Sequence, residues 1–340
     1  MLPVFDGHND VLTRADHGGF VDGRPRGHLD LSRMRAGGMR GGVFALFTPS
    51  TRERKRPLPR DDGVIEFELA RAVTHRRAAA DATRAAGRLM ALERDGHVRV
   101  ALRAAHVDEA MADDGPPVAV LHLQGAEAID PSLESLELWY AAGLRSLGPV
   151  WSRSNAFGHG VQFVFPSSPD MGPGLTASGR ALVRRCAELG ILVDLSHLNE
   201  AGFWDVASLD RGPLVASHSA AHVLCPASRN LTDRQLDAIG SSEGLVGIVF
   251  ASSFLRPDFA EDPHTPLELI VEHARYVADR IGAEHVALGS DFDGATVALH
   301  DAADLPKLLD ALADDGFSAD ELAGIAWKNW RRVLAAWWRE

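Results

Sequence analysis

Short apolar segments alternate with longer amphipathic segments along almost the whole chain of 340 residues. The apolar segments lack regular polar alternation, which is typical of parallel strands that are covered on both faces. About eight such strands, each followed by helical material, predict a (β/α)8 TIM barrel. The expected strands are Pro3–Phe5, Gly42–Phe47, Val118–Leu123, Leu144–Val150, Ile191–Leu195, Leu214–Ala216, Leu245–Phe250 and Val286–Leu288.

Amphipathic stretches between the strands are expected to form the helices of the barrel. The clearest of them are Phe67–Leu89, Leu175–Leu189, Thr232–Ile239 and Pro266–Ile281. Arg52–Asp62 and Gly158–Thr176 are expected as extended loops between a strand and its helix. Neither a composition break nor an internal repeat divides the sequence, so residues 1–340 are expected to form a single barrel domain.

A final helix is expected over Asp320–Arg339. One stripe of this helix is apolar and is interpreted as packing against the barrel; it consists of Leu322, Ile325, Ala326, Trp330, Val333, Leu334 and Trp337. Trp327 and Trp338 lie outside the stripe. They indicate either a subunit contact, as in a possible homodimer, or a loosely covered edge of the core.

The overall charge and the cysteine content exclude several classes of function. The formal net charge is -12, so a nucleic-acid partner is not expected. The basic run Arg52–Arg56 is interpreted as a solvated loop, because no amphipathic segment continues it. Cys186 and Cys225 are too few for a disulfide framework, and Cys186 is expected in the core. No leader and no run of eighteen apolar residues is found, so a soluble, cytoplasmic protein without membrane attachment is expected.

Residues that can bind a metal follow five of the expected strands. The carboxyl ends of the strands of a barrel meet at one mouth, where the active sites of this fold lie. His8 and Asp10 are two residues apart in an extended segment, so both side chains point to the same side. The set comprises His8 and Asp10 after the first strand, Glu127 after the third, His197 after the fifth, His218 after the sixth and Asp291 after the eighth.

Each of these residues alone has a simpler interpretation, such as a helix cap, a turn or a hydrogen-bonded surface histidine. Three carboxylates at one mouth, however, repel each other unless a cation neutralises them. Three imidazoles and three carboxylates exceed the needs of one tetrahedral zinc, so two ions with a bridging carboxylate and a bridging hydroxide are expected. A carboxylate outside the metal ligands would then transfer the proton. Asp291 is preferred to Asp293 for this role, because Asp291 comes first after the strand and Phe292 separates the two.

Six short motifs occur in order along nearly the whole chain: His8-x-Asp10, Gln-Gly-Ala-Glu127, Asp-Leu-Ser-His197, Ser-His218-Ser, Ser228-Arg229-Asn230 and Gly-Ser-Asp291-Phe-Asp-Gly. Together they resemble the membrane (renal) dipeptidase family of zinc peptidases. The resemblance implies that one zinc is held by His8, Asp10 and Glu127. It implies that Glu127, His197 and His218 hold the second zinc, with Glu127 as the bridge.

The same resemblance assigns the remaining roles at the expected site. Asp291 would be the general acid and base. Arg229 would bind the C-terminal carboxylate of the substrate, with Asn230 beside it, a task for which a bidentate guanidinium is suited. A surface arginine paired with Asp233 is the alternative interpretation of Arg229. Members of the family cleave dipeptides and often tolerate a D-residue on the C-terminal side.

The sequence departs from the family after the fourth strand. There the family has a substrate-polarising histidine in a Leu-Thr-His context, whereas this chain reads Leu-Gly-Pro149. The oxyanion would then depend on a metal, or on Arg153, Asn155 or His159 from the same loop.

These features predict a zinc-dependent dipeptidase that acts on dipeptides. An alternative is an N-acyl amino acid deacylase, a lactonase or another hydrolase on the same binuclear site. A neutral ester would not need Arg229, whereas a substrate with a free carboxylate would. A metal-binding or scaffold protein without turnover is a third hypothesis, but a purely structural zinc site needs no proton shuttle such as Asp291.

Overall fold

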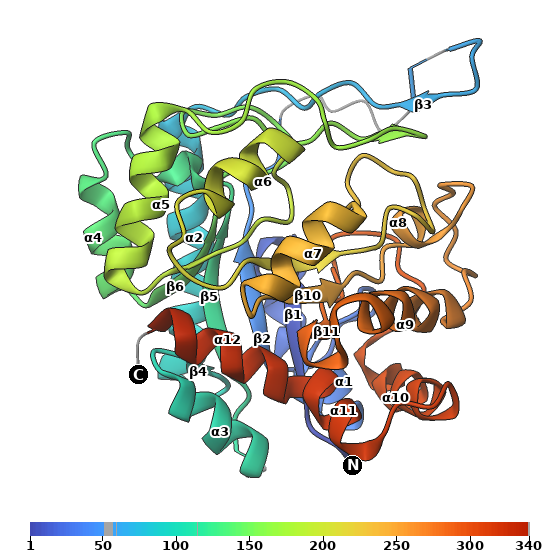
Figure 1. The fold of residues 1–340 in the computed structure, drawn as a ribbon. Helices are drawn as coiled ribbons and strands as arrows, with labels where there is room; N and C mark the ends of the chain where they lie inside the picture. Colours follow the sequence, from blue (N-terminus) through green and yellow to red (C-terminus); the bar gives the residue numbers. More distant parts are fainter. Residues whose placement is uncertain (51–56, 59, 114, 339–340) are drawn as a thin grey trace.

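Eight parallel strands form the centre of the molecule in the part that the structure, a computed structural model, describes (Figure 1). The described residues are 1–340 without 51–56, 59, 114 and 339–340. The barrel strands are β1 (Val4–Asn9), β2 (Met39–Leu46), β5 (Val118–Gln124), β6 (Leu144–Gly148), β8 (Leu192–Val193), β9 (Val215–Ser219), β10 (Leu245–Ile248) and β11 (Val286–Leu288). Helices surround these strands, which confirms the predicted TIM barrel.

The barrel strands form two sheets that meet at two places, here called seams. Strands β1, β2, β5, β6 and β8 pair in that order, with the short strand β4 (Arg99–Val100) beside β5, and β9, β10 and β11 form a second sheet. An isolated parallel bridge between Asp194 and Val215 joins β8 to β9. A second bridge, between Asn9 and Phe292, joins the end of β11 to β1. The carboxyl ends of all eight strands therefore face one mouth.

The strands are buried on both faces, as their apolar composition predicted. Every residue of β1 and β5 is buried, including His8 and the polar residues of β5. The first strand extends to Asn9, beyond its predicted end at Phe5, so His8 lies within the strand and Asp10 directly after it. This extension places a polar side chain on the inner wall of the barrel.

Helices cover the outside of the barrel (Figure 1). Their bounds are α1 (Leu31–Ala36), α2 (His75–Arg94), α3 (Ala104–Ala112), α4 (Glu134–Ala141), α5 (Ala177–Leu189), α6 (Glu200–Ala207), α7 (Asp233–Ser241), α8 (Ser252–Leu255), α9 (Glu268–Ile281), α10 (Leu305–Asp314), α11 (Ala319–Ala323) and α12 (Asn329–Trp338). Local sequence explains several ends. Thr232 and Gln235 form a capping box at the start of α7, and Gly190 ends α5 with a φ of 74°.

The helix predicted over Phe67–Leu89 was wrong at its start. Phe67 is extended, and its backbone N–H donates to the carbonyl of Phe163 at 3.0 Å. The helix α2 begins only at His75, because the Thr74 hydroxyl caps it by accepting from the N–H of Arg77. The segment before it forms β3 (Ile65–Glu66), which pairs antiparallel with β7 (Val164–Phe165) at the top of Figure 1.

The predicted loops agree with this arrangement as far as they are described. The two-residue strand β7 lies within Gly158–Thr176, which otherwise forms the expected irregular segment. Of Arg52–Asp62, the residues 52–56 and 59 lie outside the described part of the chain. The interpretation of the basic run Arg52–Arg56 as a solvated loop therefore stays a prediction.

The last predicted helix, Asp320–Arg339, is interrupted in the structure. A π-helical turn, Gly324–Lys328, separates α11 from α12, and Arg339 lies outside the described residues. The Asn329 side-chain amide anchors the break by donating to the carbonyls of Ala283 and Val286. The predicted stripe is buried apart from the half-buried Leu322. Apolar periodicity continues through the turn, which is why the sequence alone indicated one helix.

The two tryptophans outside the stripe lie at the edge of the core. Trp338 is buried and its indole N–H donates to the carbonyl of Arg145, whereas Trp327 is half-buried. A buried Trp338 fits the interpretation as an edge of the core. The possible homodimer stays a prediction.

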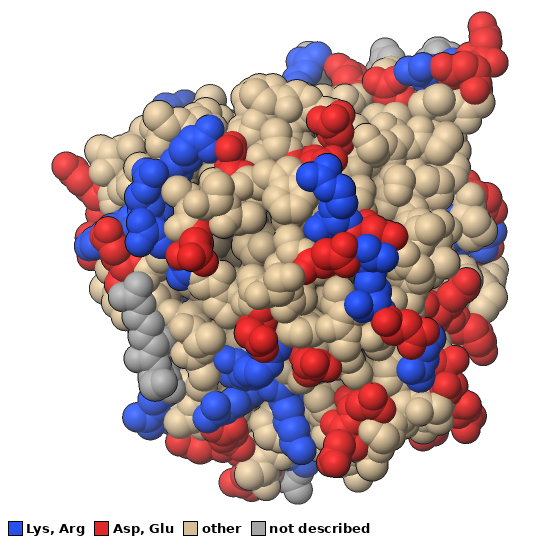
Figure 2. Space-filling model, viewed as in Figure 1, with Lys and Arg blue, Asp and Glu red and all other residues tan. Residues whose placement is uncertain are grey.

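Basic and acidic side chains are interspersed over the face of the molecule drawn in Figure 2.

Cys186 and Cys225 are both buried and unpaired, as expected for a chain without a disulfide framework. Among the described residues, we find no helix with the length and apolar character needed to cross a bilayer. The cytoplasmic location stays a prediction.

Candidate metal centre

Three histidine side chains meet inside the mouth of the barrel. The rings of His8 and His218 stack with their centroids 3.8 Å apart, and Nε2 of His197 lies 3.1 Å from Nε2 of His218. Burial lowers the pKa of all three rings well below the usual range. The rings are therefore neutral, which is the form that binds metals.

The nitrogen atoms of these rings are poised for a cation. His197 and His218 each have Nδ1 beside a serine hydroxyl, which leaves both Nε2 atoms directed inward. The side-chain amide nitrogen of Gln124, a donor, lies 3.0 Å from Nε2 of His197 and 3.5 Å from that of His218. Both ring nitrogens of His8 are buried and have no hydrogen-bond partner among the residues that the structure describes. An unpaired buried acceptor is costly, so these atoms fit a metal ligand set.

Two carboxylates converge on His8 from the β1/β11 seam. Ligand atoms of His8, Asp10 and Asp291 all lie within 4.8 Å of one another. Burial and the carboxylates of Asp291 and Asp293 raise the pKa of Asp10. Burial raises the pKa of Asp291 to about 7, against the opposing effect of Arg229. Both carboxylates gain from a nearby cation, which is the chemistry that the sequence predicted.

Gly294 allows these two carboxylates to converge. A Cβ atom at this position would lie 2.2 Å from Oδ1 of Asp291 and 2.3 Å from Oδ2 of Asp10. The turn before it places Asp291 at a φ of 59°, a left-handed conformation that aspartate tolerates better than most residues. The Gly-Ser-Asp-Phe-Asp-Gly motif thus has a steric requirement at its last position.

Glu127 lies in the short turn after β5. Its Oε1 accepts from Nε of Arg153 at 2.6 Å. Gly125, with a φ of 90°, makes room for it, since a Cβ there would lie 2.4 Å from Oε2 of Glu127. Among the described residues, the three-residue groups with converging ligand atoms do not include Glu127. Its role as the bridge between two metals therefore stays a prediction.

The two predicted arginines are both buried at the mouth. Arg229 donates from Nη1 to the Ser219 hydroxyl and from Nη2 to the carbonyl of His218, each at 2.8 Å. Its Nε has no hydrogen-bond partner in the described part of the chain, and burial lowers the pKa of Arg229 to about 10. The alternative of a surface arginine paired with Asp233 is wrong, because Arg229 is only 3% exposed and Asp233 pairs with Arg280.

Arg153 is the other buried arginine. Its side chain is fully buried, Nε donates to Glu127 and Nη1 donates to the Ser50 hydroxyl. Within the described part of the chain, Nη2 has no hydrogen-bond partner. Pro149, where the family histidine is absent, is buried just after β6 and accepts a hydrogen bond at its carbonyl from Asn155. Arg153 therefore retains a free donor in the loop that was expected to replace this histidine.

The other predicted substrate contacts are engaged in local structure. Asn155 donates to Pro149 and accepts from the N–H groups of Phe157 and Gly158. The side-chain amide nitrogen of Asn230 donates to the carbonyls of Cys225 and Phe254. His159 has Nδ1 beside the Ser154 hydroxyl. These contacts order the loops, and direct substrate binding by the three residues stays a prediction.

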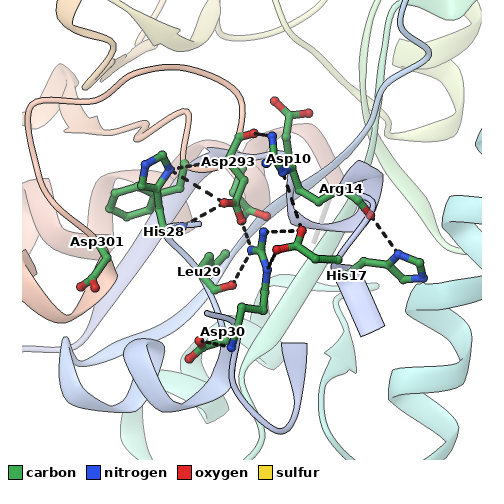
Figure 3. A network of polar contacts seen from close by, with 12 residues as sticks. Asp10, Arg14, His17, His28, Leu29, Asp30, Asp293 and Asp301 are labelled. Carbon is green, nitrogen blue, oxygen red and sulfur yellow. Dashed lines mark hydrogen bonds and ion pairs between the residues drawn. The ribbon is translucent and has the colours of Figure 1, made fainter. Parts of the chain in front are cut away.

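Asp293, the rival of Asp291, is directed into a separate network (Figure 3). Its carboxylate forms an ion pair with the fully buried side chain of Arg24 and accepts from the N–H of His28 at 2.9 Å. Arg24 also binds Asp16, and His28 accepts at Nδ1 from the N–H of Asp293. Asp291 therefore lies with His8 and Asp10, whereas Asp293 is held by Arg24. The preference for Asp291 in proton transfer stays a prediction.

Three polar residues of the inner wall were missed by the sequence analysis. His122 and Gln124 lie in β5, two residues apart, and Asp194 lies at the end of β8. Asp194 has a ligand atom within 4.8 Å of those of His8 and His218. A signal was present, because polar residues interrupt otherwise apolar strands at alternating positions, where side chains share one face.

An eight-stranded barrel with neutral imidazoles and carboxylates buried at the carboxyl ends of its strands defines a metal-dependent hydrolase. The chain belongs to the membrane dipeptidase family, peptidase family M19, whose model matches residues 1–337. It is thus a metallo-dipeptidase, a hydrolase of peptide bonds. The family resemblance seen in the six motifs is confirmed.

Solved structures and curated relatives agree with this membership. A metallo peptidase from Rhodobacter sphaeroides, liganded with a phosphinate mimic of the dipeptide L-Ala-D-Ala, is 44% identical, with a TM-score of 0.94 and 99% of each chain covered. A protein in the pqqA 5' region of Klebsiella pneumoniae is 47% identical over 72% of this chain and 91% of its own length. The dipeptidase aclJ of Aspergillus oryzae is 29% identical over 98% of this chain and 78% of its own.

Proposed function

We propose that this protein hydrolyses dipeptides, including those with a C-terminal D-residue, and that it does so with two zinc ions. The observation that carries the proposal is the buried cation of Arg229, fixed to the backbone of His218 beside the candidate ligands. A dipeptide has a free carboxylate near its scissile bond, and such a guanidinium is suited to bind it. The phosphinate ligand of the Rhodobacter sphaeroides relative supports the stereochemical part.

The candidate ligands divide into two groups in this proposal. His8 and Asp10 would hold one zinc, His197 and His218 the other, and Glu127 would bridge them. When bound, the two ions would polarise the scissile carbonyl and supply a nucleophile from water at neutral pH. Asp291, buried beside Asp10, would hold the proton and deliver it to the leaving amine. The free donor of Arg153 lies on the Glu127 side and would contact the substrate there.

A substrate panel tests the proposal. Zinc-loaded protein is assayed with L,L-, L,D- and D,L-dipeptides, with N-acyl amino acids and with lactones. We expect the highest kcat/KM for dipeptides and measurable turnover of the L,D-isomers. Preferential turnover of N-acyl amino acids or lactones would overturn the substrate assignment within the family.

The Glu127→Gln variant tests the bridge. We expect wild-type protein to bind two zinc ions and the variant to lose occupancy at both positions together, because a single carboxylate serves both. Elemental analysis after dialysis measures this, with the exposed Glu134→Gln as a matched control. One ion per wild-type chain, or full occupancy in Glu127→Gln, would contradict the bridging role.

The Arg229→Ala variant tests the anchor for the carboxylate. We expect kcat/KM for free dipeptides to fall about 10- to 150-fold. This corresponds to a loss of about 1.5–3 kcal/mol in transition-state stabilisation, the value of a hydrogen bond to a charged group. Dipeptide amides lack the carboxylate, so their kcat/KM should change much less. Equal losses on both kinds of substrate would show that Arg229 only supports Ser219 and the end of β9.

A further inference from the structure

We propose that Asp194 and Ser217 form a relay that fixes the tautomer of His218, so that Nε2 presents its lone pair to the metal. Asp194 and Ser217 are thus positioning residues. The inference rests on the proposed metal-binding role of His218. The relay itself, however, is a property of the chain alone and can be measured in the metal-free protein.

The relay is a chain of two short hydrogen bonds. The Ser217 hydroxyl lies 2.6 Å from Oδ2 of Asp194 and 2.7 Å from Nδ1 of His218. A hydroxyl has a single proton. If that proton is donated to the carboxylate of Asp194, the hydroxyl oxygen is left to accept from Nδ1–H of His218. The ring then carries its proton on Nδ1, and Nε2 is an acceptor.

The contacts of the Asp194 carboxylate are with groups that can donate to it. Its Oδ1 accepts from the N–H of Ser196 at 3.1 Å, from the N–H of Ser217 at 2.8 Å and from the Ser196 hydroxyl at 2.8 Å. With the Ser217 hydroxyl on Oδ2, four donors surround this carboxylate. Ser217 therefore donates to Asp194 and accepts from His218.

A second, independent contact supports the same tautomer. The amide nitrogen of Gln124 lies 3.5 Å from Nε2 of His218 and can only donate. Nε2 of His218 also lies 3.1 Å from Nε2 of His197. A donor placed between two ring nitrogens fits two acceptors, as a metal ion would.

The same contacts explain why Asp194 is a positioning residue and not a ligand. Its ligand atom lies within 4.8 Å of those of His8 and His218. Both of its oxygens, however, are already occupied by donors from Ser196 and Ser217. A metal ion would have to displace these contacts. Carboxylates that act behind a histidine ligand orient the ring and raise its basicity.

His197 provides an internal comparison. Its Nδ1 lies 2.9 Å from the Ser152 hydroxyl, but no carboxylate contact of Ser152 is found in the described part of the chain. No relay to a carboxylate therefore lies behind Nδ1 of His197, and its tautomer depends instead on Gln124, whose amide nitrogen lies 3.0 Å from Nε2. The inference predicts that removal of the Ser217 hydroxyl has a larger effect than removal of the Ser152 hydroxyl.

The test combines nitrogen NMR of the metal-free protein, labelled at histidine, with zinc titration. The His218 signal is identified by its absence in His218→Gln. We expect wild-type His218 to carry its proton on Nδ1, and Ser217→Ala to lose this preference. Zinc affinity should fall about 10- to 100-fold in Ser217→Ala, the usual effect of losing such a contact. Ser217→Thr, which keeps the hydroxyl, should restore both.

The matched control is Ser196→Ala. Ser196 binds the other oxygen of Asp194, accepts from the backbone N–H of His218 and has its hydroxyl 3.3 Å from that of Ser217, but it has no hydrogen bond with the His218 ring. We expect His218 in the Ser196→Ala variant to keep the wild-type tautomer. A proton on Nε2 in the wild type, or unchanged zinc affinity in Ser217→Ala, overturns the relay. Loss of the Nδ1–H tautomer in Ser196→Ala, as large as in Ser217→Ala, would also overturn the relay. The NMR result stands whatever substrate the enzyme accepts, so failure of the proposed function remains distinguishable.

Discussion

Replacement of Asp291 by asparagine is expected to lower kcat by about 10²–10⁴-fold and to leave the metal content unchanged. This is the usual cost of losing a positioned general acid and base. Asparagine keeps the size of the side chain and tolerates the left-handed backbone at this position, where φ is 59°. The effect should therefore come from lost proton transfer and not from a disturbed turn. Steady-state kinetics with elemental analysis of the same samples measure both quantities.

The metal content decides between two roles for Asp291. Its ligand atom lies within 4.8 Å of those of His8 and Asp10, so a loss of metal in Asp291→Asn would make it a ligand. Unchanged activity would leave Asp293 as the candidate. The structure argues against that outcome, because the Asp293 carboxylate already accepts from Arg24 and His28 (Figure 3).

Replacement of Arg24 by methionine is expected to destabilise the protein by about 3–5 kcal/mol, the cost of leaving a buried charge without its partner. The side chain of Arg24 is fully buried and that of Asp293 is 1% exposed. Urea denaturation measures the free energy of unfolding. The double variant Arg24→Met with Asp293→Asn should lose less than Arg24→Met alone, because no charge is then orphaned.

Asp16→Asn is the control for this pair. Asp16 binds the same guanidinium, but its side chain is 38% exposed, so its contribution should stay below about 1 kcal/mol. A loss in Asp16→Asn as large as in Arg24→Met would show that the whole network, and not the buried pair, determines stability. If the free energy of unfolding of the double variant equalled the sum of the two single changes, the coupling between Arg24 and Asp293 would be contradicted.

The residues at the strand ends were predictable because two local rules suffice to place them. Apolar segments mark the strands, and the parallel arrangement brings their carboxyl ends together. His8, His218 and Asp291 follow from these rules, and the structure brings them to one mouth. The exact strand ends were less predictable, as β1 shows by continuing to Asn9.

Contacts between distant segments could not be predicted. Arg24 and Asp293 are 269 positions apart, and no local pattern connects them. Asn155 and His159 have polar side chains in the right loop, but their own turn engages them. Their residue types alone do not distinguish a side chain that orders a loop from one that is free to bind a ligand.

The two seams of the barrel have a consequence for its mechanics. His8 and Asp10 belong to the five-stranded path, whereas His218 belongs to the sheet of β9, β10 and β11. Backbone hydrogen bonds cross both seams: the N–H of Asp10 donates to the carbonyl of Phe292, and the N–H of Leu195 donates to the carbonyl of Val215. The zinc proposed for His197, which follows β8 of the five-stranded path, and His218 would add a cross-link between the two sheets. We therefore expect amide hydrogens at the seams to exchange faster with solvent than those within either sheet, and metal binding to slow them selectively.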